Sequence, residues 1–158
     1  MKNLKNYFLT ILCLFSLQTA FSVDYYWVGG SGNWSNISNW ATTSGGNITH
    51  SVVPSADDNV IFDANSFTGP NQTVTINIDN IFCRNMDWSA VTNNPTFIGT
   101  RQQIINVFGS LTFSPNMTLN FDGEFQFRTD LADATVTTAN QPMGWATIFD
   151  GNGTWQFN

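Results

Sequence analysis

The segment that most constrains the fold is residues 25–40, YYWVGGSGNWSNISNW, which carries three tryptophans and no charged residue. Trp27, Trp34 and Trp40 lie among glycine, serine and asparagine, which are residues that favour turns. Large apolar rings in such a polar stretch must either be buried against another part of the chain or face a ligand. The segment therefore predicts a turn-rich structure in which the rings close a hydrophobic core or form a binding surface.

Residues 1–22 are predicted to be a secretion signal peptide. Two lysines precede an apolar run over residues 7–17, and Ala20-Phe21-Ser22 has the pattern of a cleavage site. The apolar run is too short to span a bilayer, so we expect a mature chain that begins at Val23, is exported and does not cross a membrane. Cleavage removes both lysines and leaves three arginines against 11 acidic residues. This negative charge argues against nucleic-acid partners and is compatible with bound cations.

Short runs of alternating apolar and polar residues, separated by turn clusters, fill the rest of the chain, and no convincing helix appears. The residues that these runs place on the inner side are Val74, Ile76, Ile78, Ile105, Val107, Leu111, Phe113, Met117, Leu119, Phe121, Phe125 and Phe127. A glycine-led unit, Gly-x-apolar-x-apolar, starts at Gly109, Gly123 and Gly153. The outer two copies are separated by two turns of about 22 residues each, which suits a solenoid whose middle copy lies on another face. A β-solenoid is therefore favoured, with a β-sandwich as the alternative.

Residues 25–40 and 53–67, the latter reading VPSADDNVIFDANSF, resemble the opening of a family of large secreted β-helical repeat proteins. These proteins occur in gliding bacteria that use type IX secretion, and they are described as adhesin-like. The matching residues are Trp27, Gly29, Gly32, Asn33, Trp34, Ser35, Asn39, Trp40, Pro54, Asp57, Asp58, Val60, Phe62 and Asp63. The resemblance implies a right-handed parallel β-helix, export to the cell surface, and an N-terminal cap formed by the first motif.

We therefore expect a signal peptide in residues 1–22, a cap in residues 23–58 and the first four to five β-helix coils in residues 59–158. Members of the family are longer and end in a sorting domain, so this chain is expected to be a truncated part of such a protein. The apolar strand at residues 155–157 would then leave an open coil through which the chain self-associates.

The candidate cap residues are Trp27, Gly29, Gly32, Trp34 and Trp40, because a solenoid end exposes both its apolar core and unpaired backbone groups. The alternative for the three tryptophans is an aromatic platform that stacks on sugar rings. The two possibilities differ in one observable property, since cap residues are buried whereas platform residues are exposed.

Asp57, Asp58 and Asp63 flank the apolar residues 60–62 and form a candidate Ca²⁺ site, the one cofactor that the sequence suggests. The alternative is a set of ordinary turns in which the carboxylates accept hydrogen bonds from nearby backbone N–H groups. No catalytic residue and no other metal site is predicted, because His50 and Cys83 alone cannot supply a zinc ligand set. Cys83 is expected to be buried in the core.

The expected function is that of a secreted, cell-surface, adhesin-like structural and binding protein without enzymatic activity. Its expected partners are surface glycans or other cell-surface proteins. The alternative is a polysaccharide-binding or polysaccharide-degrading module of the pectin-lyase type. Cleavage of acidic polysaccharides needs basic side chains beside carboxylates, whereas the mature chain has three widely spaced arginines and no lysine. The sequence therefore favours a non-enzymatic role.

Overall fold

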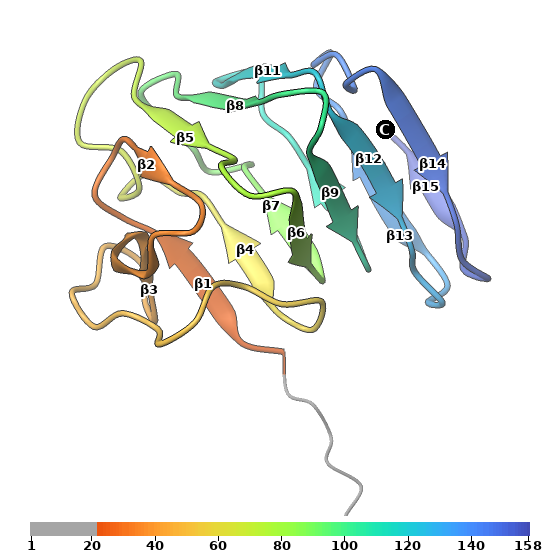
Figure 1. The fold of residues 1–158 in the computed structure, drawn as a ribbon, viewed down its shortest axis with the longest axis horizontal. Helices are drawn as coiled ribbons and strands as arrows, with labels where there is room; N and C mark the ends of the chain where they lie inside the picture. The colour runs from red at the N-terminus through yellow and green to blue at the C-terminus, as the bar shows by residue number, and fades with distance from the viewer. Residues whose placement is uncertain (1–21) are drawn as a thin grey trace, which may run out of the picture.

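The computed structural model describes residues 22–158, which form a stack of short strands along one long axis (Figure 1). The predicted signal peptide, residues 1–22, lies outside the described residues except for Ser22. A single turn of 3₁₀ helix, η1 (Ile37–Asn39), is the only helical element in the described part of the chain. The expectation of an all-β protein is therefore confirmed for these residues.

The strands form three sheets, which we call A, B and C. Sheet A contains β1 (Asp24–Trp27), β3 (Trp40–Ala41), β4 (Asn59–Ile61), β7 (Asn85–Asp87), β10 (Leu111–Thr112), β13 (Ala134–Thr137) and β15 (Trp155–Phe157). Sheet B contains β2 (Gly32–Asn33), β5 (Thr73–Thr75), β8 (Thr96–Gly99) and β11 (Thr118–Phe121). Sheet C contains β6 (Asn80–Cys83), β9 (Ile104–Val107), β12 (Glu124–Phe127) and β14 (Ala146–Phe149).

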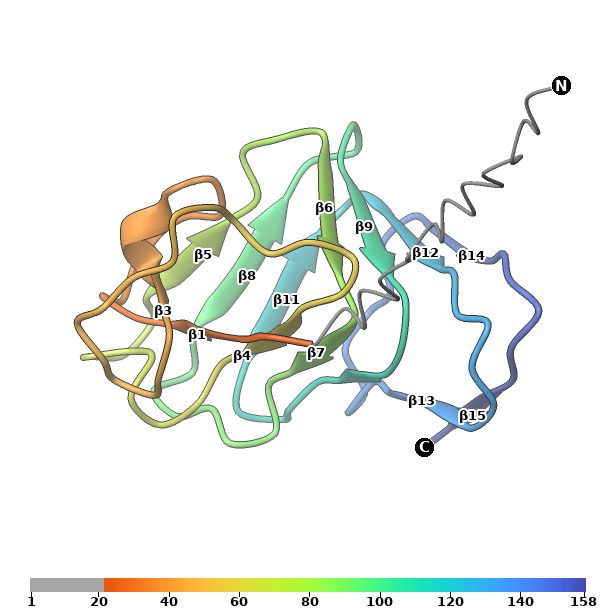
Figure 2. The same ribbon diagram turned by 90° about the horizontal axis from the view of Figure 1, so that it is seen from below.

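From β4 to β13 the chain visits sheets A, B and C in rotation, and the described part of the chain forms a coil of about four turns (Figure 2). Strands of successive turns pair in parallel and in register: Val60 pairs with Met86, and Met86 pairs with Leu111. Among the named strands of residues 22–158, the pairing of β1 with β3 is the one antiparallel exception. The predicted parallel β-helix is therefore confirmed, and the alternative β-sandwich is wrong because a sandwich is built from antiparallel sheets.

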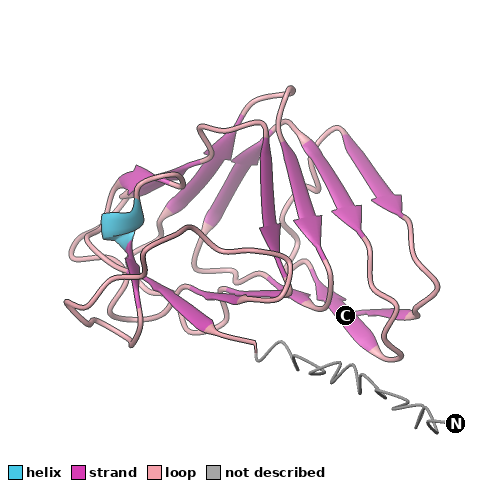
Figure 3. Ribbon diagram, turned by 60° about the horizontal axis from the view of Figure 1, so that its bottom comes forward, coloured by secondary structure: helices cyan, strands magenta, loops and turns pink. Residues whose placement is uncertain are grey.

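The alternating pattern places apolar side chains in the interior of the coil and polar side chains outside. All the residues that the sequence predicted to point inward are buried except Ile78, which is partly buried against the same core. Figure 3 shows the strands of neighbouring turns side by side along this core, with η1 at its N-terminal end. The strands from β4 to β13 each bury one face inside the coil, which explains why this part of the chain needs no covering helix.

The glycine-led units are distributed as the sequence predicted, but with a shift in register. The first and last units lie on sheet A, in β10 and β15, and the middle unit lies on sheet C, in β12. Leu111 stacks on Val136, and Val136 stacks on Phe157 rather than Trp155. The two-residue shift arises because turns differ in loop length, so a uniform turn of about 22 residues is only an average.

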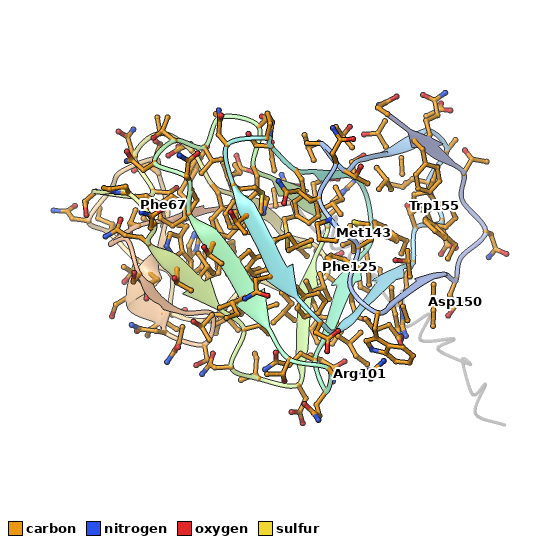
Figure 4. All side chains as sticks on the ribbon, turned by 90° about the horizontal axis from the view of Figure 1, so that it is seen from above. Phe67, Arg101, Phe125, Met143, Asp150 and Trp155 are labelled. Atoms are coloured by element: carbon orange, nitrogen blue, oxygen red, sulfur yellow. The ribbon has the colours of Figure 1, made fainter. Side chains whose placement is uncertain are left out.

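The turn that contains β13 and β14 differs from those before it, because a loop over residues 138–145 lies where sheet B would continue. The Gln141 amide of this loop donates to the carbonyl oxygens of Ser114 and Met117 at 3.1 and 2.8 Å, and its oxygen accepts from Leu119 N–H at 3.0 Å. Met143 is partly buried against the core (Figure 4). A single glutamine side chain thus replaces part of a missing strand at the edge of β11.

No helix of residues 22–158 is long and apolar enough to cross a bilayer.

Candidate functional site

The three motif tryptophans form the centre of an aromatic cluster at the N-terminal end of the coil. Trp27, Trp34 and Trp40 are each 0% exposed. The Trp40 ring meets the Trp27 and Trp34 rings edge to face, with centroid separations of 4.9 and 4.7 Å. Phe62 and Phe97 lie beyond them, at 6.1 Å from Trp40 and Trp34 respectively, and connect the cluster to the following turns. The cluster is therefore continuous with the hydrophobic core.

Two glycines allow the chain to turn sharply at the end of β1. Gly29 and Gly30 have φ values of +85° and +78°, which residues with a side chain rarely adopt. The turn brings the Gly30 carbonyl oxygen to 2.7 Å from the Trp27 indole nitrogen, which donates a hydrogen bond to it. Gly29 and Gly30 are thus needed for a backbone turn that also gives the buried Trp27 indole N–H its hydrogen-bond acceptor.

Gly32 and Asn39 form the second contact of the motif. A Cβ atom at Gly32 would lie 2.5 Å from Asn39 Oδ1, so a side chain there would displace the Asn39 amide. Asn39 is buried and its Nδ2 donates to the Val28 carbonyl oxygen at 2.8 Å. The asparagine therefore ties the last residue of η1 to the residue that follows β1.

The Trp40 indole nitrogen donates to the Trp34 carbonyl oxygen at 2.8 Å, which closes the loop between the two tryptophans. The predicted burial of Trp34 and Trp40 is confirmed. In this arrangement neither ring can stack on a sugar, because stacking needs an open ring face. The five predicted cap residues, Trp27, Gly29, Gly32, Trp34 and Trp40, thus lie in one structural unit at the first turn of the coil.

The three candidate calcium ligands, in contrast, are not brought together. The Asp58 carboxylate accepts hydrogen bonds from the backbone N–H and the hydroxyl of Ser55, at 2.9 and 2.6 Å. Asp63 Oδ1 accepts from the Asn65 backbone N–H at 2.8 Å, and Asp57 is exposed. Within residues 22–158 no three His, Cys, Asp or Glu side chains form a metal-binding group. The carboxylates of Asp58 and Asp63 are engaged in local turns of the kind the sequence offered as the alternative.

His50 and Cys83 both pack against other parts of the coil. The His50 ring stacks on Tyr25 with a centroid separation of 3.6 Å, and its Nε2 lies 3.2 Å from the Asp24 carbonyl oxygen. Cys83 is fully buried on β6, as predicted, and desolvation raises the pKa of its thiol far above the ordinary value. A thiol in this environment stays protonated and is therefore a poor nucleophile.

Trp145 is an exposed aromatic residue that the sequence analysis did not single out. It is the most exposed of the six tryptophans, at 52%, and the Arg101 guanidinium carbon lies 4.9 Å from the centroid of its ring. The two residues are far apart in the sequence and belong to different turns of the coil. No local pattern marks their contact, and it becomes visible only once the register of the turns is known.

These features define the chain as a parallel β-solenoid with a buried aromatic cluster at its N-terminal end. We find no pocket in the described part of the protein. Comparisons with protein-family models, curated proteins and solved structures gave no match to the chain.

Proposed function

We propose that the chain is a secreted, cell-surface, adhesin-like protein that acts as a rigid scaffold and binding surface and has no enzymatic activity. The proposal is supported by the resemblance of residues 25–40 and 53–67 to the secreted β-helical proteins of gliding bacteria. The observation that carries it is a continuous row of polar side chains along the outside of sheet A, which we call the outer ladder.

The outer ladder joins successive turns of the coil by side-chain hydrogen bonds. Asn59 Nδ2 donates to Asp24 Oδ1 at 2.7 Å, and Asn85 Nδ2 donates to Asn59 Oδ1 at 2.8 Å. Asn85 Oδ1 accepts from the Ser110 backbone N–H at 2.7 Å, and Ser110 Oγ accepts from the Thr135 N–H at 3.0 Å. One row of short polar side chains thus runs along the outer side of five successive strands of sheet A.

Such a row suits a protein that works outside the cell and bears mechanical load. Adjacent strands lie about 4.8 Å apart, so equivalent polar groups repeat at that spacing along the coil. From β4 to β13, the contacts between turns combine backbone ladder bonds with buried apolar side chains, so this part of the coil resists bending. A stiff polar surface of this kind offers many weak contacts to a glycan or protein surface, and their combined strength is large.

Self-association is a further part of this proposal. Strands β14 and β15 are the last strands of sheets C and A, and each pairs on one side only in the described chain. Phe149 and Phe157, on these strands, are exposed although their register partners Phe127 and Val136 are buried. We propose that this turn pairs with a second copy of the chain. Light scattering of the purified chain is expected to show a dimer or larger species, and a monomer at tens of micromolar would contradict self-association.

The cellular proposal is tested by locating the chain in a gliding bacterium that uses type IX secretion. The full chain with a C-terminal epitope tag is compared with a variant that lacks residues 2–22. Because the sorting domain of such proteins is expected to be missing here, the outer membrane is permeabilised first; we then expect added protease to remove the tag from the full chain, while the tag of the shortened variant stays protected. A full chain that remains protected inside the cell would contradict the proposed location.

The second candidate function is that of a polysaccharide-binding module, and the half-exposed Trp145 favours it. Its degrading form, a pectin-lyase-like enzyme, is tested by incubating the chain with polygalacturonate and measuring new reducing or unsaturated ends. We expect none. Release of such ends that disappears in the Asp58→Asn variant would contradict a non-enzymatic role.

A further inference from the structure

Trp145 and Arg101 meet at the corner between sheets B and C. Arg101 lies in the turn before β9, and Trp145 immediately precedes β14, so the two residues are two turns apart in the coil. The Arg101 guanidinium carbon lies 4.9 Å from the Trp145 ring centroid, within the range of a cation–π contact. Figure 4 shows Arg101 at the edge of the molecule, away from the buried Phe125.

The intervening turn has no side chain at the one position that lies between Gln103 and Trp145. Glu124 pairs with Ala146 and with Ile104, so Gly123 is the residue of the middle turn that lies between Gln103 and Trp145. Trp145 N–H donates to the Gly123 carbonyl oxygen at 3.1 Å, which fixes the backbone below the ring. A Cβ at Gly123 would lie 2.2 Å from the Gln103 carbonyl oxygen, so this position cannot carry a side chain without a backbone shift. The glycine thus leaves a gap in the side-chain rows that Trp145 and Arg101 bridge.

The contact positions the tryptophan without burying it. Trp145 keeps 52% of its surface exposed, whereas four of the other five tryptophans, Trp27, Trp34, Trp40 and Trp88, are 0% exposed. A large aromatic side chain that is held in place and still open to solvent is typical of a binding surface, because little conformational entropy is lost when a ligand stacks on it. Gln102, next to Arg101 in the sequence, and Asp122, next to Gly123, are exposed and polar, and the residue before Trp145 is a glycine.

The chemistry of this corner matches a sugar ring. The face of an indole is electron-rich, and the C–H groups on one face of a pyranose carry partial positive charge, so the two surfaces attract each other. Arg101 lies over one face of the ring, so a sugar would stack on the opposite face. Gln102 and Asp122, exposed polar residues of the same corner loops, add groups of the kind that hydrogen-bond to sugar hydroxyls. A neutral sugar fits better than an acidic one, because the exported chain carries 11 acidic residues and three arginines.

We propose that Trp145, positioned by Arg101, is a stacking site for neutral polysaccharides. The site is distinct from the buried tryptophans of residues 25–40, and its position on the outside of the coil leaves room for a chain of sugar units to pass across sheet C. The proposal rests on the proposed adhesive function and deepens it by naming the class of ligand.

The test is affinity electrophoresis of the full chain in gels that contain hydroxyethyl cellulose, laminarin or polygalacturonate, together with retention on chitin beads. Four proteins are compared: wild type, Trp145→Ala, Arg101→Ala and Phe82→Ala. Phe82, on β6 of sheet C, is the matched control, because it is also an exposed aromatic residue but makes no cation–π contact in the described part of the chain. Melting temperatures close to that of wild type are expected for Trp145→Ala, because half of this side chain is already in solvent.

We expect wild type to be retarded by at least one of the three neutral polymers, and Trp145→Ala to bind that polymer about tenfold more weakly. Arg101→Ala should lose less, and Phe82→Ala should bind as wild type does. No retention of wild type on any neutral polymer, or equal retention of wild type and Trp145→Ala, would overturn the proposal. Retention by polygalacturonate alone would show that the ligand class is wrong. These assays use purified protein, so a negative result leaves the cellular location to its own test.

Discussion

Replacing Trp34 with alanine tests whether the aromatic cluster at the N-terminal end supports the whole coil. A fully buried aromatic side chain removes about 150–250 Å² from water, which corresponds to roughly 4–6 kcal/mol at about 25 cal/mol per Å². Partial relaxation around the cavity and the remaining methyl group reduce this value, so a loss of roughly 3–5 kcal/mol is expected. Trp34 Nε1 has no hydrogen-bond acceptor, so no hydrogen-bond energy is added.

The assay is urea unfolding followed by circular dichroism, with Trp145→Ala as the matched control. Trp145 is 52% exposed, and its replacement should cost no more than about 1 kcal/mol. For a chain of this size the Trp34→Ala loss corresponds to a fall in melting temperature of about 10–15 °C. If the two variants unfold at the same urea concentration, the claim that Trp34 is a supporting residue is refuted.

Three other outcomes follow from specific contacts. Trp40→Phe should be less stable than Trp34→Phe by about 1–2 kcal/mol, because only Trp40 donates its indole N–H to a buried carbonyl oxygen; equal unfolding midpoints would contradict this. Gly109→Ala should destabilise the chain by about 1–3 kcal/mol, because the new Cβ would lie 2.4 Å from Asn85 Oδ1 and 2.9 Å from the Arg84 carbonyl oxygen. Gly69→Ala is the control and should be nearly neutral, because nothing lies within 4 Å of its Cβ position. Cys83 should react with a thiol reagent only after unfolding. Because its pKa is raised in the folded state, the folded protein holds this proton more tightly than the unfolded chain. The free energy of unfolding should therefore fall as the pH rises above the ordinary thiol pKa. Rapid labelling of the native protein would contradict the burial of Cys83.

The sequence predicted the fold well because each strand carries its own signal. A strand with apolar residues at every second position reveals its inner face without reference to its neighbours, and Val74, Leu119 and Phe125 are buried accordingly. The glycine-led units predicted a coil for the same reason, since each unit is a short strand preceded by a tight turn. The exact register could not be predicted, because it depends on loop lengths that vary from one turn to the next.

The motif of residues 25–40 was interpretable because its contacts are local. Trp27 bonds to Gly30, and Trp40 bonds to Trp34, so the spacing of the motif reflects the structure directly. The pair of Trp145 and Arg101 has no such local signal, because its members meet only after two turns of the coil have formed. The use of Gln141 in place of a strand is equally invisible in the sequence, since it depends on which backbone groups the preceding turn leaves unpaired.

The cluster, the outer ladder and the proposed stacking site all depend on the parallel register of the turns, and disulfide trapping tests that register most directly. Thr73 and Thr96 are register partners on β5 and β8. Cysteines at these two positions would lie about 4.8 Å apart, which is within the range that a disulfide can bridge. Cysteines at Thr73 and Ile98, two residues out of register, would be about 8 Å apart and could not be bridged. We predict that mild oxidation of the native protein, read out by mass spectrometry, joins the first pair nearly completely and the second hardly at all. Efficient joining of the second pair, or of neither, would contradict the parallel coil.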